Sequence, residues 1–292
     1  MPVDHEIDSR NKNIQIYING SFYHRDEAKI SVYDSGFLMG DGIWEGLRLI
    51  NNKWIFIDEH VDRLFEGCKA IDLDIKMTKE DIVNALDETK AINNMFNEVH
   101  ARLMITRGNK SKPFQQPHLS ESGINIVIIM EHSKPSIDVK NITMATVPQV
   151  RGMPMSQDPK LNSHSKLNCI LACIQANKLG ADEALMLDPL GFVNTTNSCN
   201  FFIVKNNQVW TSTGDYCMNG VTRQNIINLC KENDIPIYEK NFSLVDVYSA
   251  DEAFITGTLG SLTNVTSIDN RNIGKDNNPI SDKLRNYYKK LL

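Results

Sequence analysis

The segment His164-Ser165-Lys166-Leu167-Asn168 places a lysine directly before a predicted helix. The helix is expected over residues 167–179, because apolar residues recur there at three- and four-residue spacing and Gly180 can end it. A lysine at the start of a helix can lean into a cleft, where a lowered pKa makes its amine a nucleophile for carbonyl carbons. It can equally be a solvated surface residue, so other residues must decide its role. The apolar positions are Leu167, Ile170, Leu171 and Ile174.

Length and charge exclude several classes of protein. The 292 residues suffice for one large domain or two ordinary ones. A formal net charge of −5 gives no basic footprint for nucleic acid or an anionic membrane, and no apolar run approaches the roughly 20 residues that span a bilayer. Residues 1–12 lack the apolar core of a signal peptide, and we expect them to form a frayed tail. The sequence thus predicts a cytoplasmic protein.

The cysteines and histidines do not follow a metal-binding pattern. The chain contains neither a C-x-x-C pair nor an H-E-x-x-H cluster, and several cysteines lie among apolar neighbours. We therefore expect buried free thiols in a reducing cytosol, without disulfides and without a metal site. The six cysteines are Cys68, Cys169, Cys173, Cys199, Cys217 and Cys230.

Residues 1–148 are predicted to form a small N-terminal lobe of mixed α/β structure. Helices are expected over 59–70, with Asp58 as the N-cap, and over 78–92, with Thr78 as the cap. The polar loop 107–122 is long enough to indicate a functional role. Strands are expected over 14–18, 28–33, 44–50, 54–57, 99–106, 124–130 and 142–147.

Residues 149–162 are predicted to link two lobes, because they hold prolines and few periodic apolar residues. A larger C-terminal α/β lobe is expected over 163–292, and its strands and helices alternate without a regular βαβ array. Neither a GxGxxG unit after a strand nor a Walker loop occurs, so nucleotide binding by those routes is not supported. Beyond the helix after Lys166, helices are expected over 220–232 and 281–291, and strands over 184–187, 201–204, 208–211, 235–239 and 252–256.

Three separate places could bind a phosphate. Arg63 offers a planar guanidinium, and Val221 and Thr222 offer backbone N–H groups at a predicted helix start. Thr258 follows Gly257 and offers an N–H and a hydroxyl with little steric hindrance. Each place has an ordinary alternative. Arg63 could pair with an acidic residue of its own helix, Thr222 could cap its helix, and Thr258 could lie in a simple turn.

Together with Lys166, these places form an ordered set of motifs that resembles the fold-type IV (class IV) pyridoxal-phosphate aminotransferases. That family includes branched-chain aminotransferases, D-amino acid transaminases and aminodeoxychorismate lyases, and the branched-chain group is the nearest in motif. The resemblance runs from about residue 14 to about residue 275. Its six motifs are Gly40-Asp41-Gly42-Ile43-Trp44-Glu45-Gly46-Leu47-Arg48, Glu59-His60-Val61-Asp62-Arg63-Leu64, Ser165-Lys166-Leu167-Asn168, Asn200-Phe201-Phe202, Gly220-Val221-Thr222-Arg223 and Thr256-Gly257-Thr258.

The resemblance implies a fold, a cofactor and a set of roles. The fold would have two α/β lobes with pyridoxal 5'-phosphate between them, assembled as a homodimer whose active sites share residues. Lys166 would form the covalent imine with the cofactor and then act as the general base and acid in the proton shift. The cofactor phosphate would be held by Arg63, Val221, Thr222 and Thr258.

Thr195 departs from the family pattern. The family usually places a glutamate against the pyridine nitrogen, and Thr195 occupies that position here. A carboxylate keeps the nitrogen protonated and makes the ring a strong electron sink, whereas a neutral hydroxyl does not enforce this. We therefore expect either slow transamination or a different reaction. Alternatively, a nearby residue or a shifted register replaces the glutamate.

A second departure concerns the substrate. D-amino acid transaminases carry an arginine and a histidine in the loop after the T-R-G triplet, where this chain has Lys112 and Phe114, which weakens a D-specific interpretation. The branched-chain Tyr-x-Arg strand motif reads His100-Ala101-Arg102 here. We therefore expect the substrate to be a small, branched-chain amino acid with a 2-oxo acid as its acceptor. The candidate substrate-binding residues are Arg48, Arg102, Trp44, Met39, Lys112 and Leu259, although either arginine could instead form a structural ion pair.

Three alternatives to a branched-chain transaminase remain at this point. The first is a D-amino acid transaminase, the second is a lyase of the aminodeoxychorismate type, and the third is a cofactor-binding protein that has lost turnover. The third is motivated by Thr195. Release of pyruvate without an acceptor would favour the lyase, and turnover that depends on a 2-oxo acid would favour a transaminase.

Overall fold

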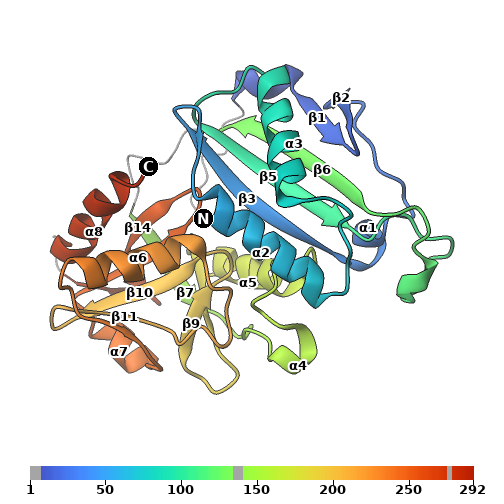
Figure 1. The fold of residues 1–292 in the computed structure, drawn as a ribbon. Coiled ribbons are helices and arrows are strands. Elements are labelled where there is room, and N and C mark those ends of the chain that lie inside the picture. The colour runs from blue at the N-terminus through green and yellow to red at the C-terminus, as the bar shows by residue number, and fades with distance from the viewer. Residues whose placement is uncertain (1–7, 134–140, 275–277) are drawn as a thin grey trace. The chain divides into compact units, whose positions relative to one another are not determined.

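The computed structural model describes residues 8–133, 141–274 and 278–292, and these form two compact units (Figure 1). The N-terminal unit comprises the described residues up to 133 together with 162–166. The C-terminal unit comprises 141–161 and the described residues from 167 onward. No helix within these described ranges is both long and apolar enough to cross a bilayer.

The predicted lobe boundaries need two corrections. Strand β7 (Ile142–Thr146), predicted within the N-terminal lobe, pairs with β8 and β14 of the C-terminal unit. Lys166 and the four residues before it belong to the N-terminal unit, not to the C-terminal one. The predicted linker 149–162 also holds a short helix, α4 (Pro154–Gln157). A strand pattern identifies the strand but not its partner strand, which is why these boundaries were wrong.

A six-stranded antiparallel sheet in the order β2-β1-β6-β5-β3-β4 forms the base of the N-terminal unit. Its central strands β3 and β5 pair from Gly42 with Thr106 to Leu49 with Val99. The strands are β1 (Gln15–Ile18), β2 (Ser21–His24), β3 (Gly42–Ile50), β4 (Lys53–Trp54), β5 (Val99–Thr106) and β6 (Asn125–His132).

Three expectations for this unit are wrong. The strand expected over 54–57 is limited to Lys53–Trp54, and Ile57 already begins a helix. Residues 28–33 contain no strand, because their apolar side chains find no partner strand, and Ile30 and Val32 remain exposed. Of the expected tail, residues 1–7 lie outside the described part, whereas Ser9–Asn13 form a 3-10 helix. This helix is tied down, because the Asn11 side chain donates to the His132 carbonyl over 2.9 Å and accepts from the His132 N–H over 2.7 Å.

Helices α2 (Ile57–Ala70) and α3 (Lys79–Ile92) pack on the sheet of the N-terminal unit (Figure 1). Phe56, in a left-handed conformation, is the N-cap of α2, so the expected cap Asp58 lies inside the first turn, where its charge favours the helix dipole. Thr78 caps α3 through the predicted hydroxyl bond. On β3 the odd-numbered side chains face α2, so Trp44 and Arg48 lie on the opposite face. The remaining helices here are α1 (Ser35–Met39) and a 3-10 turn (Pro117–Leu119).

The C-terminal unit contains a nine-stranded mixed sheet. Its main path is β12-β11-β10-β13-β14-β7-β8-β9, with β15 beside β14, and a pair between β9 and β10 closes six strands into a ring. The ring strands are β7, β8 (Glu183–Leu187), β9 (Val193–Thr196), β10 (Asn200–Lys205), β13 (Glu252–Gly257) and β14 (Ser261–Ile268). The others are β11 (Gln208–Thr211), β12 (Ile237–Glu239) and β15 (Arg271–Asn272).

Alternate side chains of these strands enter two different cores. One face packs Phe201, Ile203 and Ile255 together with the short helix α7 (Leu244–Tyr248). The other face carries Phe202 and Phe254, whose rings stack at 4.9 Å, and it lies against α6 (Val221–Glu232) and α8 (Pro279–Lys289) (Figure 1). We call this second face the outer face.

Helix α5 (Leu167–Lys178) covers another part of the outer face and does so with alanines. Ala172 and Ala176 pack with Ala184 and Met186 of β8. The helix is where the spacing predicts it, but the apolar stripe that marked it is not the buried side. Leu167, Ile170, Leu171 and Ile174 are 67%, 51%, 44% and 45% exposed.

Candidate active site

Lys166 lies on a short segment that completes one edge of β3. The Trp44 N–H donates to the Asn162 carbonyl over 3.0 Å, and the His164 N–H donates to the Gly42 carbonyl over 3.0 Å. Strand β4 pairs only with the far end of β3, so the segment takes an edge that β4 leaves open. The sheet of the N-terminal unit therefore positions Lys166, and the next residue begins α5.

Two glycines of the first motif let this segment approach. At Gly40, whose φ is +70°, an added Cβ would overlap the Ser165 side chain, and at Gly42 it would lie 2.7 Å from Cδ2 of His164. The Ser165 hydroxyl also donates to the Gly40 carbonyl over 3.3 Å. The glycine motif and the lysine motif, which are far apart in the sequence, are thus the two sides of one backbone contact.

The indole ring of Trp44 lies close to two of the predicted cationic side chains. Its Nε1–H donates to the Ser163 carbonyl over 3.1 Å, which fixes the indole beside the lysine segment. Cζ of Arg102 lies 3.9 Å from the centre of the indole ring, and Nζ of Lys166 lies 5.5 Å from it. The structure therefore brings Lys166, Trp44 and Arg102 together, as a cation–π arrangement allows.

Arg48 and His100 extend this group along the sheet. Arg48 pairs directly with His100 across β3 and β5, and Arg102 lies two residues along on the same face. Burial and the two arginines lower the pKa of His100 to about 4, so its ring is neutral at neutral pH. Burial also lowers the pKa of Arg102 from its usual value, but a guanidinium keeps its charge in proteins. This face is therefore positively charged and suited to a carboxylate.

Arg63 lies on the opposite face of β3, held by Glu45. Its Nε and Nη2 donate to the two carboxylate oxygens of Glu45 over 2.8 and 2.7 Å, and His60 Nδ1 lies 2.8 Å from the same carboxylate. Burial opposes ionisation of Glu45, but the hydrogen bonds from Arg63 and His60 outweigh it and hold the pKa of that carboxyl below its usual value. Glu45 thus fixes the direction of the Arg63 guanidinium.

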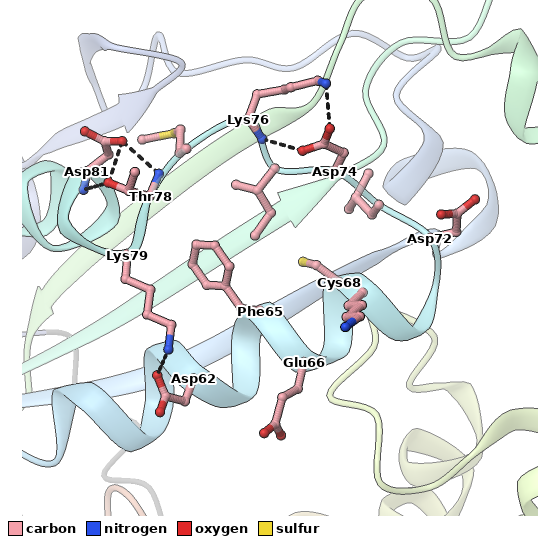
Figure 2. A pocket seen from close by; sticks show the side chains of 14 residues that line it. Asp62, Phe65, Glu66, Cys68, Asp72, Asp74, Lys76, Thr78, Lys79 and Asp81 are labelled. Carbon is pink, nitrogen blue, oxygen red and sulfur yellow. Dashed lines mark hydrogen bonds and ion pairs between the residues drawn. The ribbon is translucent and has the colours of Figure 1, made fainter.

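The acidic neighbours of Arg63 on its own helix do not bind it. Asp62 forms an ion pair with Lys79, and Asp62 and Glu66 line a surface hollow of about 750 Å³ between α2 and the start of α3 (Figure 2). The other interactions in this hollow are a local pair between Asp74 and Lys76 and the cap of α3. None of the predicted site residues lines the hollow, so we assign the site elsewhere.

The C-terminal unit carries a row of polar side chains on its outer face. Asn200 pairs with Thr195 on one side and with Thr256 on the other. Residues directly opposite in a ladder point to the same face, and all three side chains are buried. The Thr256 hydroxyl has no hydrogen-bond partner within the described structure, which is unusual for a buried oxygen.

The start of α6 lies over this row. An added Cβ at Gly220, the N-cap of α6, would overlap the Asn200 side-chain oxygen, and no side chain caps the helix. The N–H groups of Val221 and Thr222 therefore stand at an uncapped helix N-terminus beside the row. Thr222 is buried, with its hydroxyl oxygen 3.5 Å from that of Tyr288. Uncapped N–H groups, a buried hydroxyl and the unpartnered Thr256 hydroxyl together fit a phosphate group.

Among the described residues, no carboxylate stands in for Thr195 on this face. The Thr195 hydroxyl donates to the Cys199 carbonyl over 2.5 Å. The nearest acid on the neighbouring strand, Glu183, accepts hydrogen bonds from Thr196 and Ser198. Side chains of adjacent strand residues point to opposite faces, so Glu183 lies on the other face.

The remaining predicted residues lie on loops. Thr258 and Leu259 form the turn between β13 and β14. Met39 ends α1 and is 37% exposed, and Lys112 is exposed in the loop after β5. Helix α1 ends beside the lysine segment, because the carbonyl of Gly40, which follows Met39, accepts a hydrogen bond from the Ser165 hydroxyl. Asn200 lies at the centre of the polar row, which the sequence did not indicate. Its only sequence signal is its place in the Asn200-Phe201-Phe202 motif.

Comparison with known proteins confirms the resemblance. Residues 42–268 match the family described as "Amino-transferase class IV". A putative branched-chain-amino-acid aminotransferase of Methanocaldococcus jannaschii is 37% identical over 95% of this chain and 96% of its own length. A branched-chain-amino-acid aminotransferase-like protein of Arabidopsis thaliana is 36% identical over 96% of this chain, which spans only 51% of that relative.

The fold matches a solved structure as well. The branched-chain aminotransferase of the thermophilic archaeon Thermoproteus uzoniensis, solved with norvaline, superposes with a TM-score of 0.87 at 27% identity, over 95% of this chain and 94% of that one. The motifs, the fold and the family match agree. The chain belongs to the class IV aminotransferase family.

Proposed function

We propose that this protein is a pyridoxal-phosphate-dependent aminotransferase that moves an amino group between a small, branched-chain amino acid and a 2-oxo acid. The observation that carries the proposal is the position of Lys166, which β3 and the indole of Trp44 hold at the junction with α5. We further propose that the enzyme is a cytoplasmic homodimer whose active sites share residues. These two properties rest on the family resemblance.

We infer these roles for the predicted cofactor residues. Arg63, Val221, Thr222 and Thr258 would hold the phosphate of pyridoxal 5'-phosphate, and Glu45 would orient Arg63. The bound cofactor supplies an aldehyde for the amine of Lys166 and a conjugated ring that spreads negative charge from the substrate. Lys166 would then act as the general base that takes the proton from the substrate Cα and as the general acid that gives it up again in the proton shift.

The cationic face of the N-terminal unit would bind the substrate carboxylate. Arg48 and Arg102 lie on one face of β3 and β5 beside a neutral His100. A guanidinium matches a carboxylate in geometry and charge. The exposed apolar side chains of Phe37 and Met39 are available to contact an aliphatic substrate side chain.

One observation favours a second candidate function. The buried Thr195 hydroxyl donates to the Cys199 carbonyl and is not a carboxylate, which weakens the case for fast transamination. A lyase of the same family, which releases pyruvate without an acceptor, is therefore the alternative to test. Trapping the Lys166 amine with borohydride does not distinguish the two, but their dependence on an acceptor does.

The test combines trapping with turnover. Purified protein is incubated with pyridoxal 5'-phosphate, reduced with borohydride and digested, and mass spectrometry should locate the adduct on Lys166. Lys166→Ala should abolish it, while Lys178→Ala, an exposed lysine of α5, should not. Leucine with 2-oxoglutarate should give glutamate. An adduct on another lysine, or pyruvate release from D- or L-substrates without an acceptor, would contradict the proposal.

A further inference from the structure

We propose that Thr195 and its surroundings keep the ring nitrogen of bound pyridoxal phosphate unprotonated, so that this chain uses a weaker electron sink than a carboxylate would create. This inference rests on the proposed function. It concerns residues of the C-terminal unit alone, and four features of that unit support it.

The first feature is the distance between the phosphate site and Thr195. The start of α6 lies over Asn200, and Thr195 is the next residue in the same row. Directly paired residues lie about 5 Å apart, so Thr195 is close to the α6 N-terminus and on the same face. A phosphate bound at the α6 N-terminus would leave its attached ring on the face that carries the Thr195 hydroxyl.

The second feature is that each buried carboxylate in the described part of this unit already accepts hydrogen bonds from groups other than Thr195. Glu183 lies on the other face with Thr196 and Ser198 as donors. Asp188 accepts backbone N–H groups of its own turn. Glu252 is on the outer face but four residues before Thr256, about 13 Å along the strand, and it accepts the first N–H groups of α8.

The third feature is the sign of the helix dipole. The N-terminus of α6 carries a partial positive charge, and it lies on the same face as Thr195. It attracts a phosphate and supplies no negative charge beside Thr195. A pyridinium buried there without an acidic partner would be an unpaired buried charge, which is strongly disfavoured.

The fourth feature is that the Thr195 hydroxyl can serve an unprotonated nitrogen. Its hydrogen goes to the Cys199 carbonyl over 2.5 Å, and the same carbonyl also accepts the Thr196 N–H over 2.9 Å. If the hydroxyl turns to donate to the ring nitrogen, the carbonyl keeps one partner. The switch exchanges one hydrogen bond for another and leaves no buried group unpaired.

The chemical consequence is slower removal of the substrate Cα proton. A neutral ring accepts less negative charge from the Cα carbon than a pyridinium ring, so removal of the Cα proton by Lys166 meets a higher barrier. A carboxylate at position 195 should retain a proton on the nitrogen and lower that barrier.

The experiment measures the ring nitrogen directly. Protein loaded with pyridoxal 5'-phosphate that carries ¹⁵N in its ring is examined by NMR, and the wild-type signal should lie at the unprotonated position and stay there from pH 7 to pH 8. Thr195→Glu should move the signal to the protonated position. Thr195→Val, which removes the hydroxyl without adding charge, should leave it unprotonated.

The outcomes separate this inference from the proposed function. A protonated signal in the wild-type protein would overturn the inference even if Lys166 carries the cofactor. A protein that binds no cofactor at Lys166 would overturn the proposed function and the inference together. The wild-type measurement decides alone if Thr195→Glu does not fold or does not bind the cofactor.

Discussion

The two units present opposite chemistry on the faces that carry the predicted site residues. In the N-terminal unit, Arg102 and Lys166 are cations beside the same indole ring. Arg48 is a further cation on the β3–β5 strand pair. In the C-terminal unit, Thr195 and Thr256 are neutral hydroxyl residues beside an uncapped helix. In the proposed site, charge would position ligands through the first unit, and oriented hydrogen-bond donors would position them through the second. Substitutions in the two units should therefore fail in different ways.

The largest effect is expected from Arg102→Met. Loss of a charged hydrogen bond to the substrate carboxylate costs about 3 kcal/mol, so kcat/KM should fall about 100-fold. Arg10→Met, on an exposed arginine of the first 3-10 helix, is the matched control and should leave kcat/KM unchanged. An equal loss in both variants would remove Arg102 from the substrate site.

The next effect concerns the pH dependence of stability. The pKa of His100 in the folded protein is about 4, below the 6.5 of an unfolded chain. Between these values the unfolded state binds the extra proton, so the contribution of His100 to stability is complete above pH 6.5 and falls as the pH drops towards 4. From pH 7 to pH 5 the free energy of unfolding should fall by about 2 kcal/mol because of this group.

His100→Gln should remove that part of the pH dependence, and His118→Gln, on an exposed loop, should not. Urea unfolding at the two pH values measures both. If the wild type and His100→Gln lose equal stability between pH 7 and pH 5, burial and the arginine neighbours do not hold the ring neutral.

The same contrast explains what the sequence could predict. β5 matches its predicted range, and α3 starts at its predicted cap, because strand alternation and capping are local properties. The motifs also predicted the family. Pairing is not local, so the sequence did not reveal that β7 joins the C-terminal sheet or that the segment before Lys166 returns to β3.

The candidate site was predictable as a list of residues but not as a set of contacts. Nothing in the spacing of Arg63 indicates Glu45, 18 residues earlier, because that pair depends on α2 lying over β3. The stripe of Ile170 and Ile174 predicted the correct helix but the wrong buried side, since the outer face of β8 accepts only the alanines of α5. Periodicity locates a helix; packing chooses its inner face.

A smaller effect is expected from Glu45→Gln, which should weaken binding of the cofactor. The amide keeps the shape but removes the charge that orients Arg63, so the Kd for pyridoxal 5'-phosphate should rise about tenfold, equivalent to about 1.4 kcal/mol. The control is Glu66→Gln, which faces the hollow of Figure 2 on the same helix. Cofactor fluorescence titration measures the Kd. An unchanged value for Glu45→Gln would show that Arg63 does not hold the phosphate.

The smallest effect is expected from Thr222→Val at the start of α6. Its backbone N–H remains, and only one neutral hydroxyl bond of about 1 kcal/mol is lost, so the Kd for the cofactor should rise about fivefold. Thr213→Val, whose hydroxyl donates to Asp215, is the control. Because a helix dipole is screened by salt but a neutral hydroxyl bond is not, the ratio of the two Kd values should stay constant as ionic strength rises. A ratio that falls towards one at high salt would mean that Thr222 acts through charge, and the contrast between the units would fail at this residue.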